Sequence, residues 1–167
     1  MYKYIGVFNH SGNQIDITDP CYDKDVWCRT KQELPEGKYD CWIEIVDCGD
    51  WGKRIAKSTI IKEDCDYDDD IFWSECVAEI GVDAGLAGFF DNKPDYDNDA
   101  WSDFCDMLDG DSWVVDENTA AKCNGFFTSS GFGDGCYDVF ALYNKDDKLI
   151  GYSIEFIKEE SEEDDDE

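Results

Sequence analysis

Histidine is nearly absent from this chain, and its scarcity excludes several kinds of catalytic site. His10 is the single histidine among 167 residues. A metal site built on two histidines is therefore excluded, and a Ser-His-Asp or Cys-His triad would have to use His10. Because His10 stands beside Ser11 and Gly12 in the turn-rich stretch HSGN, we expect it to be a surface turn residue.

Basic residues are also scarce, which bears on the choice of partner. The chain has 14 Lys and Arg against 42 Asp and Glu, a formal net charge of −28. A field of this sign repels nucleic acid, anionic lipid headgroups and acidic substrates. We expect no direct contact with nucleic acid or a membrane, and we expect a basic protein surface as the partner. General acidity that serves only solubility is the alternative.

Long apolar runs are missing as well. None approaches the roughly 18 residues that span a bilayer, and the start MYKYIGVF does not resemble a signal peptide. The nine cysteines are odd in number, and the closest pairs lie seven positions apart, which disfavours a zinc site. We therefore expect a cytoplasmic protein with free, largely buried thiols, although an oxidised framework remains an alternative.

The acidic surplus is divided between a tail and a folded domain. Residues 159–167 hold eight acids and no base, so we expect residues 158–167 to be a disordered acidic tail. Residues 1–157 still carry 34 acids against 13 bases, a net charge of −21. With 42% hydrophobic and 15% aromatic residues over the whole chain, we expect 1–157 to form a single acidic domain with a real core.

Short alternating and β-branched runs predict a mainly β protein with one helix. Asp97 or Asn98 can cap a helix over 98–108, whose residues Trp101, Phe104, Cys105 and Leu108 share one face. We expect the first two strands to form a hairpin around HSGN. Many short strands at close spacing, with only one helix, indicate an antiparallel sandwich or a partly open barrel. The expected strands are 3–8, 14–18, 39–46, 53–61, 71–82, 112–116, 122–128, 136–143 and 148–157.

Three short motifs combine Asp with Gly or Pro: Asp19-Pro20-Cys21, Val82-Asp83-Ala84-Gly85 with Asp91 downstream, and the stretch SGFGDG at 130–135. One interpretation is that these carboxylates lock turns at strand ends. The other is a shared cleft that binds calcium or magnesium weakly, or that supplies an acid–base pair, through Asp19, Asp83, Asp91 and Asp134. The cleft candidates are Asp19, Asp83, Gly85, Asp91, Gly133, Asp134, Gly135 and Tyr137.

Candidate interaction residues lie outside these motifs. Trp27, Trp51 and Trp113 stand beside expected turns and are candidates for exposed anchors at an interface. Two acidic runs, 64–70 and 91–99, add further charge. From these runs the candidates are Asp68, Asp69, Asp70, Asp95, Asp97 and Asp99.

Taken together, the segments SG…DP, PEGKY, KRIA, VDAGLAGFFD and SSGFGDGCYDVF…LIGYSIEF resemble a bacterial and phage family known only as a domain of unknown function. The resemblance spans most of 11–156, and the chain departs from the family in its load of Cys and Asp and in its acidic tail. It implies a mainly β fold, but no catalytic roles, because the family has no established activity. The motif positions are Asp19, Pro20, Asp83, Gly85, Asp91, Gly131, Gly133, Asp134, Gly135 and Tyr137.

The charge of the domain favours a non-enzymatic binding protein. We expect an inhibitor or regulator that docks on a basic, nucleic-acid-binding surface of another protein, as phage anti-defence and nuclease-immunity proteins do. One alternative is a cation-dependent hydrolase or divalent-metal-binding module that uses clustered Asp residues. The other is an acidic scaffold without a specific partner.

Overall fold

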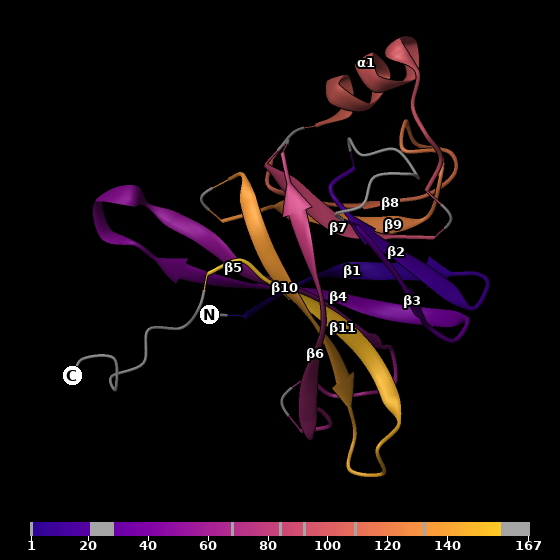
Figure 1. The fold of residues 1–167 in the computed structure, drawn as a ribbon, viewed down its shortest axis with the longest axis vertical. Coiled ribbons are helices and arrows are strands. Elements are labelled where there is room, and N and C mark those ends of the chain that lie inside the picture. The colour runs from indigo at the N-terminus through magenta and orange to yellow at the C-terminus, as the bar shows by residue number, and fades with distance from the viewer. Residues whose placement is uncertain are drawn as a thin grey trace.

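The computed structural model describes residues 2–20, 29–67, 69–83, 85–91, 93–108, 110–131 and 133–157, without the side chain of Trp51. Within these ranges two antiparallel sheets pack as a sandwich, with one short α-helix outside them (Figure 1). The mainly β prediction is confirmed in its sandwich form. The expected tail at 158–167 lies outside the described residues.

The larger sheet has six strands in the order β1-β4-β5-β11-β10-β6. Its strands alternate: Tyr39, Cys41 and Ile43 of β4 face the core, while the residues between them point outward. The strands are β1 (Tyr2–His10), β4 (Gly37–Asp47), β5 (Lys53–Lys62), β11 (Leu149–Glu155), β10 (Gly135–Tyr143) and β6 (Trp73–Val82).

The smaller sheet has five strands in the order β3-β2-β7-β9-β8. They are β3 (Thr30–Glu33), β2 (Gln14–Thr18), β7 (Leu86–Phe90), β9 (Gly125–Ser129) and β8 (Ser112–Val115). The inner faces of the two sheets bury one apolar core, which includes Phe8, Ile17, Phe89 and Ile154. The hydroxyls of Ser58 in β5 and Thr128 in β9 lie 2.7 Å apart and join the two sheets inside that core.

Helix α1 (Asn98–Met107) covers the outer face of the five-stranded sheet (Figure 1). It begins where expected, because the Asp97 side chain accepts a hydrogen bond from the Ala100 amide at 2.8 Å. Phe104 is fully buried and stacks on Phe127 of β9 at 5.3 Å. The described residues contain no helix long and apolar enough to cross a membrane.

The expected hairpin between the first two strands is wrong. β1 pairs with β4, whereas β2 pairs with β3 and β7, so the chain passes from one sheet to the other at Ser11–Asn13. Two strands were also not predicted. β3 is short and polar, and β7 is buried on both faces, so neither shows the alternation that marks a half-buried strand.

The cysteines differ from the expected buried set. Seven lie in the described residues and all seven are free, but only Cys41 and Cys123 are buried. Cys76, Cys105 and Cys136 are exposed because they occupy outward positions of β6, α1 and β10. Cys105 therefore does not belong to the buried face of the helix.

Candidate functional site

The first two Asp-containing motifs meet at one end of the sandwich. Asp19 follows β2 and is fully buried, and its carboxylate accepts a hydrogen bond from the Asp83 amide at 2.6 Å. Asp83 itself follows β6. The Asp19 carboxylate thus fixes the chain where it leaves β6.

The third motif lies beside the second. The Ser130 amide donates to the Gly85 carbonyl at 3.1 Å, and the Tyr137 hydroxyl donates to the Gly133 carbonyl at 2.6 Å. Gly85 and Gly133 have φ angles of 72° and 112°, which favour glycine in these turns. Gly135 opens β10 opposite Val82, and Asp134 is exposed at the turn. These contacts support the turn-locking interpretation.

Asp91 is separated from the other three motif carboxylates. It follows the opposite end of β7, four residues beyond the position opposite Asp19, or about 13 Å along the strand. Its carboxylate accepts hydrogen bonds from the amide and hydroxyl of Ser11 at 3.0 and 2.5 Å. Among the described residues, no group of three or more His, Cys, Asp and Glu side chains could hold a metal ion. The prediction of one cleft shared by Asp19, Asp83, Asp91 and Asp134 is therefore wrong.

His10 is buried, not at the surface as expected, because the chain crosses between the sheets directly after it. Its Nε2 lies 2.9 Å from the Leu34 carbonyl, and its Nδ1 lies 3.8 Å from Asp91 Oδ1. The Ser11 hydroxyl donates to Asp91 and not to His10. His10, Ser11 and Asp91 therefore join two chain segments and do not form a nucleophilic triad.

Of the three predicted tryptophan anchors, only the side chain of Trp113 lies in the described part of the chain, and it is not exposed. Trp113 stacks on Phe127 at 4.9 Å within the cluster beneath α1, so its prediction as an exposed anchor is wrong. The reason is that β8 places it on the helix-covered face. Trp51 lies in the short 3-10 turn η1 (Gly49–Trp51), and Trp27 lies outside the described residues.

The two acidic runs lie on opposite sides of the molecule. Asp97 caps α1, and Asp95 and Asp99 are exposed beside it. Asp69 and Asp70 belong to the segment between β5 and β6, which borders the other sheet. Asp68 lies outside the described residues. The runs therefore do not merge into one patch.

A group of aromatic rings gathers on the outer surface of the six-stranded sheet, which we call the open face. Tyr4 lies opposite Trp42, and their rings lie 5.4 Å apart. Tyr67, from the segment between β5 and β6, contacts Trp42 at 5.2 Å and Tyr2 at 4.7 Å. Tyr2 and Tyr4 are each 49% exposed, unlike the rings beneath α1.

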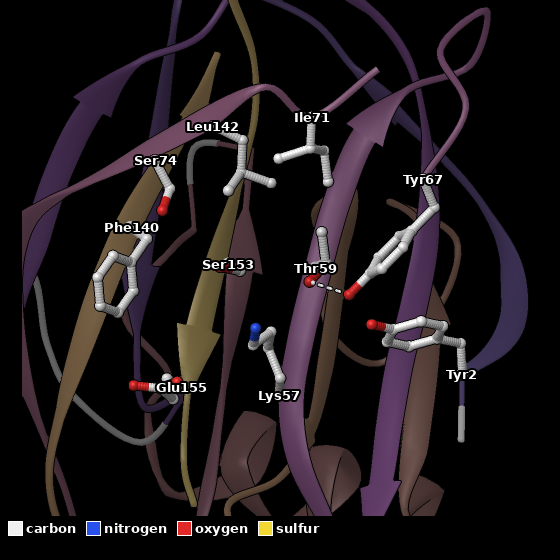
Figure 2. A pocket seen from close by; sticks show the side chains of 10 residues that line it. All are labelled: Tyr2, Lys57, Thr59, Tyr67, Ile71, Ser74, Phe140, Leu142, Ser153 and Glu155. Carbon is white, nitrogen blue, oxygen red and sulfur yellow. Dashed lines mark hydrogen bonds between the residues drawn. The ribbon is translucent and has the colours of Figure 1, made fainter. Parts of the chain in front are cut away.

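The open face contains a hollow of about 320 Å³ between these rings and Phe140 (Figure 2). Thr59 and Ser153 are its buried floor, and the Thr59 and Tyr67 hydroxyls lie 3.4 Å apart. Lys57 lies between Phe140 on one side and Tyr2 and Tyr67 on the other, and Glu155 lies on the side of Phe140 (Figure 2). The remaining lining residues are Ile71, Ser74 and Leu142.

A row of charged residues crosses the open face beside the hollow. In the strand register, Glu44 lies opposite Lys57, Lys57 opposite Glu155, Glu155 opposite Asp138, and Asp138 opposite Glu79. We call these five residues the acid row. Like charges directly opposite each other on paired strands are destabilising. The pairs Glu155–Asp138 and Asp138–Glu79 are therefore unfavourable, whereas Lys57 lies opposite Glu44 and Glu155 as a favourable neighbour.

Asp40 and Tyr4, which lie close together on the open face, both have raised pKa values. Burial, followed by the charge of Glu63, raises the pKa of Asp40, although its hydrogen bond with Tyr4 partly opposes this. Burial, followed by the charge of Asp40, raises the pKa of Tyr4. Both groups therefore resist carrying negative charge, mainly because they are partly desolvated and secondarily because of the acids beside them.

The open face was not among the predicted sites, although one signal for it was present. Asp40, Trp42 and Glu44 alternate with buried residues in a strand that was predicted, so an outward tryptophan between two acids could have been found. Nothing in the strand pattern predicts that Tyr67 folds over Trp42. The chain matches no protein-family model, no curated protein and no solved structure, so the family resemblance stays a prediction.

Proposed function

We propose that this chain is a non-enzymatic binding protein that docks its open face on a basic surface of another protein. The observation that carries the proposal is the acid row, in which Glu155, Asp138 and Glu79 face one another on three adjacent strands. Such an arrangement disfavours folding, and a partner's cations would relieve it. Local violations of folding rules are typical of functional sites.

The rest of the chain shows that carboxylates can be neutralised where the fold requires it. Asp16 in β2 is buried, and it pairs with Arg29 at 3.2 Å and with Lys31 at 3.1 Å. No ion pair holds Glu155 or Asp138 within the part of the chain that the structure describes. The open face therefore keeps carboxylates available for a partner.

The aromatic rings supply the second property of an interface. Tyr and Trp are enriched among the residues that dominate binding energies, and they act best at a desolvated centre. Tyr2 and Tyr4 lie half exposed beside the acid row, and Trp42 is partly buried against the cluster of Ile61, Leu142 and Ile150. A docked partner would bury these rings and bring its cations to the carboxylates.

The partner class follows from this chemistry. The most basic surfaces of proteins are commonly those that bind nucleic acid, because they must neutralise phosphates. An acidic face that covers such a surface would compete with nucleic acid, which makes an inhibitor or regulator of the anti-defence or nuclease-immunity type the function that we propose. The alternative of a hydrolase or metal module has no support from the separated motif carboxylates.

Displacement of DNA from a basic probe tests this function. The full chain is added to a complex of polylysine and labelled duplex DNA at low salt, and DNA release is measured by fluorescence anisotropy. We expect the double variant Asp138→Asn/Glu155→Gln to require about tenfold more protein for the same release, because close charge pairs contribute strongly at interfaces.

The matched control is Asp103→Asn/Asp106→Asn, which makes the same charge change on exposed positions of α1. The concentration of this control that releases the DNA should lie within about twofold of the parent's, because distant surface charges are screened. If both double variants lose the ability to release DNA to the same extent, the attraction depends on net charge alone. That result supports the acidic scaffold and overturns the proposal.

A further inference from the structure

The hollow in the open face has a composition that the docking proposal does not yet explain. Phe140 borders one side and Tyr67 and Tyr2 border the other, with Lys57 between them and Glu155 on the side of Phe140 (Figure 2). Its volume of about 320 Å³ is at the lower end of the range for ligand sites. The hollow is thus suited to a single side chain or a small molecule.

The carboxylates around the hollow determine which kind of group it would hold. Glu155 lines it, and Asp138 lies directly opposite Glu155 on the neighbouring strand. The carboxylates of Glu155, Asp138 and Glu79 lie on three successive strands, with Lys57 on the other side of Glu155, so they form a line and do not converge on a point. A line of carboxylates beside flat rings fits an organic cation better than a metal ion.

We propose that the hollow receives one arginine side chain of the basic partner, with its guanidinium stacked on the ring of Phe140 or Tyr67 and bonded to Glu155. This inference rests on the proposed docking function and specifies its central contact. Arginine is chosen over lysine because a planar guanidinium both stacks on aromatic faces and pairs with carboxylates in a fork geometry. Lysine offers a compact, strongly hydrated charge instead.

Lys57 allows a test in which the predicted change in affinity is an increase. It lines the hollow and lies between Glu44 and Glu155 in the acid row. A guanidinium in the hollow would be repelled by Lys57, so Lys57→Met should strengthen binding about threefold to tenfold, the range of a modest surface electrostatic change. An anionic or hydrogen-bonding neutral ligand would lose affinity in the same variant.

The experiment compares an oligo-arginine and an oligo-lysine peptide of equal length by calorimetry with the full chain. We expect the parent to prefer oligo-arginine by about tenfold, and Phe140→Leu to reduce this preference to about twofold, because stacking on the ring is lost. Tyr67→Leu serves as the second variant. Trp73→Leu, which removes a ring stacked on Tyr143 and outside the lining of the hollow, should keep the preference.

The outcomes separate this inference from the docking function. If both peptides bind equally and the preference is the same in all variants, the arginine site is wrong while open-face docking still stands. If neither peptide binds, or if the acid-row variants behave like the α1 control, the docking function fails as well. Weaker peptide binding by Lys57→Met also overturns the arginine assignment.

Discussion

The outer faces of the two sheets differ in how far other parts of the chain cover them. The five-stranded sheet is covered by α1, and Phe104 beneath the helix is fully buried. The six-stranded sheet also carries aromatic rings outward, but Tyr2 and Tyr4 remain 49% exposed. Similar residue types therefore act as core on one face and as candidate contacts on the other, so aromatic content alone does not identify a binding surface.

The faces also differ in how they use acidic residues. Beside the helix, Asp97 satisfies the Ala100 amide, and in β2 the charge of Asp16 is matched by Arg29. On the open face, no ion pair holds Asp138 or Glu155 among the described residues, although Lys57 lies opposite Glu155 in the register. Contacts within the fold thus satisfy the acids of the covered side, whereas the register places Glu155, Asp138 and Glu79 of the open face opposite one another.

The largest expected effect is a loss of stability when the packing beneath α1 is disrupted. Phe104→Ala removes a ring that stacks on Trp101, Tyr96 and Phe127, and it should lower the free energy of unfolding by about 3–5 kcal/mol. Tyr4→Ala on the open face should cost roughly 1 kcal/mol, because its ring is half exposed. Urea unfolding of both variants measures the difference, and similar losses would contradict the contrast between the faces.

A smaller effect concerns the start of the covering helix. Asp97→Ala leaves the Ala100 amide without its acceptor and should cost about 1 kcal/mol of stability. Asp103→Ala, at an exposed position within α1, should change stability by less than about 0.5 kcal/mol. Thermal unfolding followed by circular dichroism compares the two variants. A loss in Asp103→Ala as large as in Asp97→Ala would show that the cap is not the cause.

The same contrast explains how much could be predicted from the sequence. Strands that have one buried and one exposed face, such as β4 and β10, were predicted because their residues alternate. β7 is buried on both faces, so it has no alternation and was missed. Turn residues at HSGN predicted a change of direction, but they carry no information about which sheet the chain enters next.

The candidate site was harder to predict than the fold. The Asp motifs attracted attention because Asp beside Gly has a recognisable spacing, yet Asp19 and Asp91 use their carboxylates for backbone amides at different ends of β7. The acid row joins two pairs from consecutive strands, β4–β5 and β10–β11, with Glu79 of β6, and only the strand order and register bring the three parts together. Such a site requires knowledge of strand order, which local patterns do not contain.

The smallest expected effect has the opposite sign and tests the open face directly. Asp138→Asn removes the charge that faces both Glu155 and Glu79, so it should raise the free energy of unfolding by about 0.2–1 kcal/mol. Urea unfolding at low and high salt measures this gain, which should shrink as salt screens the repulsion. The same variant should weaken binding to the basic probe. A variant that is more stable yet binds less well would show that this carboxylate is kept for a partner and not for the fold, whereas a loss of stability would mean that Asp138 supports the sheet.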